Sequence, residues 1–162
     1  MFVRLFSDGA CSGNGQEGNC RGGYGTILQA FNGDQMIAER EYSKGFINTT
    51  NNRMELLGVI TGLENLTKPC DIEIISDSKY VVDAFNQNWI EVWIKNGWKN
   101  SQKKPVKNRD LWERLIKLLE PHNVKFTWVK GHNDHPENER CDRLAVNAYN
   151  GENLIEDTGF EG

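Results

Sequence analysis

The sequence FVRLFSDG at residues 2–9 is a nearly unbroken apolar run that ends at a carboxylate and a glycine. Such a run is typical of a central β-strand that is covered on both faces. A second run, IEIISD at residues 72–77, ends in the same Ser-Asp pair. Because side chains alternate between the two faces of a strand, Asp8 and Asp77 point the same way if the strands lie parallel and in register. We therefore expect the two carboxylates to meet.

The pairing of Asp8 with Asp77 can be interpreted in two ways. Each aspartate taken alone is a common way to end a strand and begin a turn. Two carboxylates that lie close together, however, repel each other unless a cation lies between them. The matched endings favour a metal site over two unrelated turns.

The bulk composition is that of one globular domain. A length of 162 residues is enough for a full core, and 38% hydrophobic with 26% charged residues is ordinary for this class. No run approaches the roughly 18 apolar residues of a membrane span, and Met1 leads directly into the first strand. We therefore expect a cytoplasmic protein without a membrane partner. We also expect a monomer.

The four cysteines do not have the CxxC spacing of a zinc site. They are Cys11, Cys20, Cys70 and Cys141. In an intracellular protein these thiols should stay reduced, although Cys11 and Cys20 flank one loop and a bridge between them is left open.

Positive charge is concentrated in one segment. The formal net charge of -4 argues against a generic nucleic-acid binder. Residues 92–109, however, contain six basic and no acidic side chains, a local charge of +6 that leaves -10 for the rest. Trp89, Trp93 and Trp98 alternate with these lysines and form either a packing face or a base-stacking surface.

Local patterns predict the other elements. Residues 11–23 are too rich in glycine for anything but a loop, either a long hairpin turn or a close approach to a partner. The expected elements after this loop are strands 24–31 and 35–42, a helix from Thr49 to about Leu66, strand 72–77, a helix capped by Ser78 with a short helix after it, a helix at 108–119, strand 124–129 and a closing helix that begins near Pro136. Residues 150–162 contain four acidic and no basic side chains, so we expect a flexible or loosely packed acidic tail.

Two further carboxylates lie beside apolar helix stripes. Glu55 borders the stripe of its helix, where it either faces the sheet or interacts favourably with the helix N-terminus. Asp142 flanks the stripe of the closing helix and is either a further inward carboxylate or a solvated helix charge.

Several ordered strings resemble ribonuclease H type 1 of the bacterial kind. They are SDGA at 7–10, TTNNRMEL at 49–56, SDS at 76–78, KGH at 130–132 and HPENERCD at 135–142. The likeness runs from Phe2 to about Tyr149, so a catalytic domain of residues 1–149 and a tail of residues 150–162 are expected. Within this domain, residues from about 88 to 107 are similar to the basic protrusion of many bacterial members.

The resemblance implies an α/β fold of the ribonuclease H type, a five-stranded mixed sheet with helices on both faces. It also implies an endonuclease that cuts the RNA strand of RNA/DNA hybrids. The catalytic residues that it implies are Asp8, Glu55, Asp77 and Asp142, with His132 assisting. These four carboxylates are the same ones that the strand and helix patterns indicate.

The resemblance also implies a set of nucleic-acid contacts. They are Asn14, Asn51 and Asn52 for the RNA or the hybrid minor groove, Thr50 and Asn108 for a DNA phosphate, and Trp89, Trp93 and Trp98 along the DNA channel. The basic segment should add phosphate contacts through Lys95 and Lys99.

Four carboxylates without a Cys/His ligand cluster suit hard cations, so we expect Mg²⁺, with Mn²⁺ as a substitute. Two ions about 3.5 to 4 Å apart would bind the scissile phosphate, one generating the attacking hydroxide and the other stabilising the leaving 3′ oxygen. Asp8 would bridge them, Glu55 and Asp77 would complete one site, and Asp142 would complete the other. The products would have 5′-phosphate and 3′-hydroxyl ends.

The chain departs from the family pattern in three respects. The loop at residues 12–23 is longer than the family's compact turn and lacks its prolines, Lys79 stands where many relatives have glutamine, and the net charge is acidic. Two alternatives stay open. An integrase or Holliday-junction resolvase of the same fold would lack the TTNNRME string, and a non-catalytic hybrid-binding module would lack the carboxylates.

Overall fold

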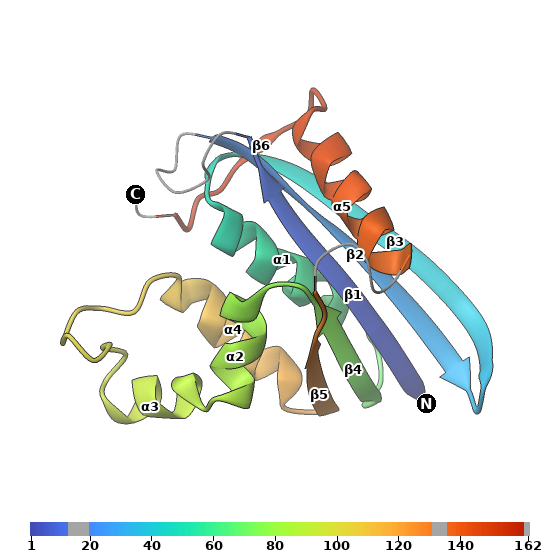
Figure 1. Ribbon diagram of the computed structural model, residues 1–162, viewed down its shortest axis with the longest axis horizontal. Helices are drawn as coiled ribbons and strands as arrows, with labels where there is room; N and C mark the ends of the chain where they lie inside the picture. Colours follow the sequence, from blue (N-terminus) through green and yellow to red (C-terminus); the bar gives the residue numbers. More distant parts are fainter. Residues whose placement is uncertain (13–19, 131–135, 161–162) are drawn as a thin grey trace.

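The computed structural model describes residues 1–12, 20–130 and 136–160. Its centre is a sheet with the strand order β5-β4-β1-β2-β3-β6 (Figure 1). The strands are β1 Phe2–Cys11, β2 Cys20–Asn32, β3 Gln35–Thr49, β4 Asp71–Ser76, β5 Asn123–Trp128 and β6 Ile155–Glu156. The helices are α1 Asn51–Glu64, α2 Lys79–Asn86, α3 Trp89–Lys95, α4 Arg109–Leu119 and α5 Pro136–Tyr149.

Strand β1 is the centre of the sheet, as its apolar sequence predicts. It pairs antiparallel with β2 and parallel with β4, and the parallel register places Phe6 beside Ile75 and Ser7 beside Ser76. Strand β5 continues the parallel side next to β4. The predicted five-stranded mixed sheet is confirmed, and the short β6 adds a sixth strand beside β3.

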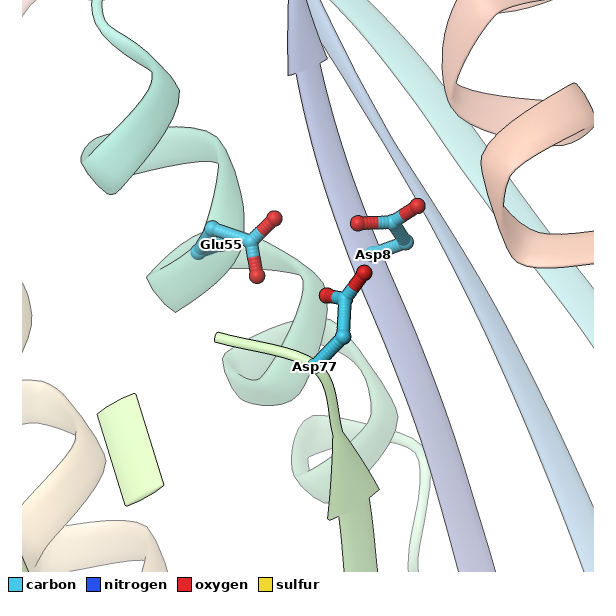
Figure 2. A group of neighbouring side chains, drawn as sticks. All are labelled: Asp8, Glu55 and Asp77. Carbon is cyan, nitrogen blue, oxygen red and sulfur yellow. The ribbon is translucent and has the colours of Figure 1, made fainter. Parts of the chain in front are cut away.

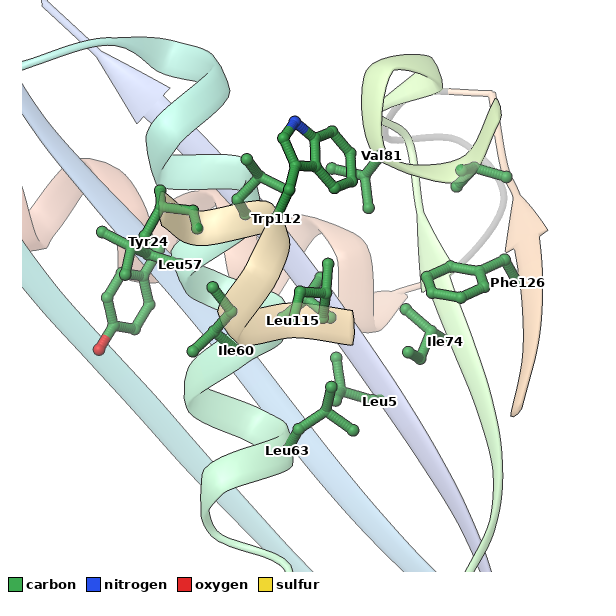
Figure 3. Close-up of a cluster of buried hydrophobic side chains, with 14 of the residues drawn as sticks. Leu5, Tyr24, Leu57, Ile60, Leu63, Ile74, Val81, Trp112, Leu115 and Phe126 are labelled. Atoms are coloured by element: carbon green, nitrogen blue, oxygen red, sulfur yellow. The ribbon is translucent and has the colours of Figure 1, made fainter. Parts of the chain in front are cut away.

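Helices cover both faces of the sheet. On one face, Leu5 and Ile74 of the sheet pack with Ile60 and Leu63 of α1 and with Leu115 of α4 (Figure 3). These side chains belong to the larger core, to which α2 also contributes. Helix α5 covers the other face, where a smaller core consists of Phe6, Ile27, Ile75, Val129 and Cys141. Both faces of β1 are therefore covered by packed side chains.

The loop in the glycine-rich segment is shorter than predicted. Cys11 ends β1, and residues 20–23 are the beginning of β2. The prediction of a loop is wrong at these positions, because Gly23 makes room for a helix, as Gly25 does further along the strand. A Cβ atom on Gly23 or Gly25 would collide with the backbone of α5. Glycine inside a strand marks such a close approach of another backbone.

The C-terminal segment is not the loosely packed tail that we expected. β6 pairs in parallel with β3 through Phe46–Ile155 and Ile47–Glu156. The side chain of Asp157 is buried, with 7% of the residue exposed, and it forms an ion pair with Arg53. The expectation is wrong for residues 155–160, because a buried counter-charge holds an acidic residue against the domain.

All four cysteines are free, so the bridge between Cys11 and Cys20 is not formed. In the part of the chain that the structure describes, no helix combines the length and the apolar character needed to cross a membrane.

Candidate active site

Three elements bring three carboxylates together at the carboxyl ends of β1 and β4. Asp8 lies near the end of β1, Asp77 follows the last residue of β4, and Glu55 comes from the second turn of α1. They face one another in Figure 2, and one ligand oxygen from each lies within 4.8 Å of the other two. The meeting of Asp8 and Asp77 that the strand endings predict is therefore present, and the parallel register is its cause.

Gly9 lets α1 reach this position. A Cβ atom on Gly9 would collide with the backbone of Met54 and Glu55, so only glycine allows the helix to pass so close to the strand. The backbone N–H of Gly9 also donates a hydrogen bond of 2.6 Å to Oε1 of Glu55. The Asp-Gly ending thus supplies one carboxylate and positions a second.

Two of the three carboxylates, Asp8 and Glu55, are buried, and the charges of the three repel one another. Only 5% of Asp8 and 4% of Glu55 is exposed. Burial raises the pKa of Asp8 to about 10, and the charges of Glu55 and Asp77 contribute to this rise. Burial, followed by the charge of Asp77, raises the pKa of Glu55 to about 8. Near neutral pH the cluster therefore needs either protons or a cation to balance its charge.

The donor set fits a hard divalent cation. Oε2 of Glu55 is buried and has no hydrogen-bond partner among the described residues, so it is available as a ligand. The carboxylates open onto a cavity of about 310 Å³ whose walls include Asn51, Ser78 and Asp142. All ligand atoms of the cluster are carboxylate oxygens, which Mg²⁺ and Mn²⁺ prefer.

Asp142 approaches the cluster from α5. It lies outside the close group of three but lines the same cavity. Its charge is one of the smaller causes of the raised pKa of Asp8. Of the two interpretations of Asp142, the structure shows the inward one.

The comparisons with known proteins agree with this geometry. The family model described as RNase H matches residues 2–150. The chain belongs to the ribonuclease H family. A ribonuclease H of Lachnoclostridium phytofermentans is 53% identical over 161 residues, which cover 99% of this chain and 100% of the relative. A ribonuclease H of Desulforamulus reducens is 51% identical over 152 residues, 94% of this chain and 90% of the relative.

Solved structures of ribonuclease H domains share the fold. The crystal structure of LC9-RNase H1, a type 1 RNase H, matches with a TM-score of 0.81 at 32% identity and covers 93% of this chain and 72% of that chain. The foamy viral protease-reverse transcriptase in complex with RNA/DNA hybrid matches with a TM-score of 0.74 at 19% identity, over 91% of this chain and 20% of that chain. The second likeness shows the fold alone.

The residues that the ribonuclease H resemblance assigns to nucleic acid lie in three places. Asn51 lines the cavity, and Asn52 is exposed next to it at the start of α1. Thr50 caps α1, and its Oγ1 accepts a hydrogen bond from the backbone N–H of Arg53. Asn108 precedes α4 and bonds to the side chain of Arg53. Asn14 lies outside the described residues, as does the catalytic candidate His132.

The tryptophans of the basic protrusion pack against one another and against the core. Trp93 meets Trp112 edge to face, with 5.4 Å between ring centroids, and its ring lies 6.3 Å from those of Trp89 and Trp98. The structure thus shows the packing face, one of the two interpretations. Lys95 and Lys99 are exposed beside these tryptophans, where a ligand in solution can reach them.

One neighbour of the site was missed from the sequence. The indole N–H of Trp128 donates a hydrogen bond of 3.1 Å to the backbone oxygen of Asp77. The ammonium group of Lys79 lies 4.8 Å from the centre of the Trp128 ring. Strand periodicity placed Trp128 in β5 but could not indicate a contact with the end of β4, because that contact depends on strand order.

Proposed function

We propose that this protein is an endoribonuclease that hydrolyses the RNA strand of RNA/DNA hybrids. The observation that carries the proposal is the convergence of Asp8, Glu55 and Asp77, with ligand oxygens within 4.8 Å of one another, in a chain of the ribonuclease H family. Relatives named ribonuclease H that are about half identical over nearly the whole chain support the activity. In this proposal residues 1–149 are the catalytic domain.

In the proposed mechanism Asp8, Glu55, Asp77 and Asp142 hold two Mg²⁺ ions, for which Mn²⁺ can substitute. When bound, the ions would supply an activated water and stabilise the leaving 3′ oxygen, so that 5′-phosphate and 3′-hydroxyl ends result. The backbone of Gly9 occupies one oxygen of Glu55 and so directs the other toward the cavity. His132 would assist proton transfer or product release, a role that rests on its place in the sequence.

Substrate selection would come from the rim of the cavity. Asn14, Asn51 and Asn52 would contact the RNA or the minor groove, where 2′-hydroxyl groups distinguish RNA from DNA. Thr50 and Asn108 would hold a phosphate of the DNA strand. Two exposed lysines, Lys95 and Lys99, would contact further DNA phosphates next to Trp89, Trp93 and Trp98, which support the channel.

The deciding experiment compares three end-labelled duplexes of one sequence. We expect Mg²⁺-dependent cleavage of the RNA/DNA hybrid and none of double-stranded RNA or double-stranded DNA. The Asp77→Asn variant, purified in parallel, controls for contaminating nuclease. Hybrid binding without cleavage would indicate a binding module, and cleavage of the DNA duplex would indicate a resolvase-like or integrase-like enzyme.

A further inference from the structure

Arg53 is a buried cation with every donor engaged. Its side chain is 2% exposed. Nε and Nη2 donate to Asp157 at 2.6 and 3.1 Å, and Nη1 and Nη2 donate to Asp110 at 2.9 and 2.8 Å. Nη1 also donates to Oδ1 of Asn108 at 3.3 Å. These bonds account for all five N–H groups of a guanidinium, so the position of Arg53 is defined by α1, α4 and the C-terminal segment, residues 155–160, together.

Arg53 determines which way the Asn108 amide faces. A guanidinium has only donors, so the amide must turn its oxygen toward Arg53. The amide nitrogen then lies on the other side, where one of its hydrogens goes to the Tyr80 hydroxyl at 3.0 Å. The second hydrogen remains for another acceptor. A phosphate oxygen is such an acceptor, and a flipped amide would present its own oxygen to the phosphate instead.

Thr50, the other residue proposed to hold the DNA phosphate, caps the same helix. The backbone N–H of Arg53 donates to Oγ1 of Thr50 at 3.3 Å. The hydroxyl oxygen is thus used as an acceptor, and its hydrogen is left to donate. Both residues proposed to hold the DNA phosphate therefore contact Arg53, Asn108 through the guanidinium and Thr50 through the backbone N–H, and each keeps a donor available.

Asp157 holds Arg53 from the C-terminal side. It is bound in turn by the Thr49 hydroxyl, which donates to Oδ2 at 2.8 Å, and its backbone N–H donates to Ile47 at 3.1 Å. Gly159 packs so closely on the pair of Arg53 and Asp110 that a Cβ atom there would collide with both. Without the Asp157 carboxylate, two N–H groups of a buried guanidinium would lose their partner, and the side chain would shift to find another.

We propose that Asp157 is a positioning residue for the DNA-strand phosphate site, acting through the guanidinium of Arg53 on Asn108. The inference rests on the proposed function, because it concerns the binding of the same hybrid. The direction of the change in hybrid affinity distinguishes this role from a simple effect of charge. Asp157 is an anion, so removing its charge should strengthen phosphate binding if charge alone mattered. Loss of positioning weakens binding instead.

The test measures hybrid affinity in the Asp77→Asn background, so that the substrate is not consumed. We expect Asp157→Ala to raise Kd about tenfold, the loss of roughly one hydrogen bond to a charged acceptor. Asp157→Asn, which keeps an acceptor oxygen of the same shape, should raise Kd less. The salt slope of binding should not change, because Thr50 and Asn108 are neutral and release no counterions of their own.

A matched control separates positioning from lost stability. Val3→Ala removes two buried methyl groups from the far end of β1, and none of the hydrogen bonds of this network involves Val3. All variants are compared well below their melting temperatures. If Val3→Ala raises Kd as much as Asp157→Ala does, or if Asp157→Ala binds equally or more tightly, the inference is overturned.

A scan of the substrate locates the effect. A set of hybrids carries single uncharged methylphosphonate groups along the DNA strand. In the Asp77→Asn background, one position should weaken binding strongly, and Asp157→Ala should remove most of that additional loss because the two changes act on one contact. Equal losses with and without Asp157→Ala would overturn the inference. If the unaltered protein neither binds nor cuts any hybrid, the proposed function itself fails, which is a different result.

Discussion

Gly9 is the residue that brings two carboxylates of the cluster within reach of each other. Its lack of a side chain allows α1 to lie against β1, and its N–H binds one oxygen of Glu55. Asp8 precedes it on the strand, and Asp77 arrives from the neighbouring parallel strand. The result is a concentration of negative charge that the metal-free protein tolerates only by holding protons.

The Asp77→Asn substitution should abolish cleavage and stabilise the metal-free protein. Removing one charge relieves the repulsion that acts on Asp8 and Glu55. Substitution of residues outside the first ligand sphere already costs 10–100-fold in metalloproteins, so loss of a ligand should lower turnover by more than about 10²-fold. Each kcal/mol added to the free energy of unfolding by this relief should raise the melting temperature in EDTA by about 3 °C.

Calorimetry and hybrid cleavage, measured on one preparation, check this prediction. Asp71→Asn makes the same chemical change at the exposed, opposite end of β4 and serves as the control. Turnover above a few per cent of normal in folded Asp77→Asn would remove Asp77 from the catalytic set.

Stability of the metal-free protein should fall as the pH rises from about 5 to 9. The folded protein retains a proton on Asp8, with a pKa of about 10, throughout this range and on Glu55 until the pH reaches its pKa of about 8, whereas both groups are ionised in the unfolded chain. Folding therefore takes up protons, and the stability present at low pH is lost as the pH rises through the folded-state values. The upper bound is about 1.4 kcal/mol per pH unit for each retained proton.

Urea unfolding at several pH values, with EDTA or with saturating Mg²⁺, measures this slope. Mg²⁺ should reduce the fall, because a bound cation balances the ionised carboxylates and competes with the protons. A pH-independent free energy of unfolding in EDTA would contradict the raised pKa values.

At the scale of elements, the sheet positions the site, and two helices pack closely against the sheet at glycine residues. α1 passes Gly9, and α5, which carries Asp142, lies directly on Gly23 and Gly25 of β2. The basic protrusion is built differently, as a set of tryptophans packed on α4 with exposed lysines outside. Close backbone packing therefore positions the carboxylate cluster, whereas exposed charge is the main feature of the basic protrusion.

Gly25→Ala should destabilise the protein by about 1–3 kcal/mol, the usual cost of an added methyl group in a packed interior. The new Cβ would meet the backbone of Cys141 and the side chain of Leu144, so α5 must move away from the sheet. The shift should also weaken cleavage, because Asp142 moves with its helix. Ser43→Ala introduces the same residue at the exposed position opposite Gly25 on β3 and should be nearly neutral. Equal unfolding midpoints in urea for the two variants would show that α5 does not depend on this contact.

Neutralising the protrusion should flatten the salt dependence of hybrid binding. The variant replaces Lys95, Lys99, Lys103 and Lys104 by glutamine. The slope of log K against log salt is negative, and it should become less steep by roughly 0.9 for every phosphate that the variant no longer binds. The Michaelis constant should rise more than turnover at saturation falls, because these lysines bind substrate and transition state alike.

A control variant with the same charge change shows whether the place of the lysines matters. It replaces Lys44, Lys68, Lys117 and Lys125, which are exposed elsewhere on the domain. Identical salt slopes for the two variants would mean that the protrusion faces away from the hybrid.

At the scale of the whole molecule, the C-terminal segment, residues 155–160, is tied to the sheet and to α1. β6 joins the far edge of the sheet, and Asp157 connects that edge through Arg53 to the start of α1 and to Asn108 before α4. The protrusion extends from the opposite side, after α2 (Figure 1). In the proposed function, a bound hybrid would contact the acidic cavity with its RNA strand and the lysines of the protrusion with its DNA strand.

The RNA strand should be recognised through its 2′-hydroxyl groups. A chimeric strand with four consecutive 2′-deoxy positions should be cut in its flanking RNA but not across the deoxy stretch, because polar groups at a shallow minor groove distinguish the sugars there. Product mapping on sequencing gels, beside the all-RNA strand, checks this. Cuts inside the deoxy stretch at the normal rate would exclude sugar recognition as the source of specificity.

Much of this structure follows from local sequence. The apolar runs predict β1 and β4, the capping residues at 49–52 and Ser78 predict the starts of α1 and α2 to within two residues, and the matched Ser-Asp endings predict that two carboxylates meet. Each of these signals is contained within a few residues. Alternation along a strand and periodicity along a helix are backbone properties, so they indicate which face is buried without reference to the rest of the chain.

The tertiary structure decided what depends on partners distant in sequence. Residues 20–23 looked like a loop because glycine frees the backbone, and only the position of α5 shows that Gly23 makes room for a helix. Residues 155–160 looked like a solvated acidic tail, because nothing near Asp157 reveals that Arg53, 104 positions earlier, would be its buried partner. A charge or a glycine has no preferred face of its own, so its role is set by what the fold places beside it.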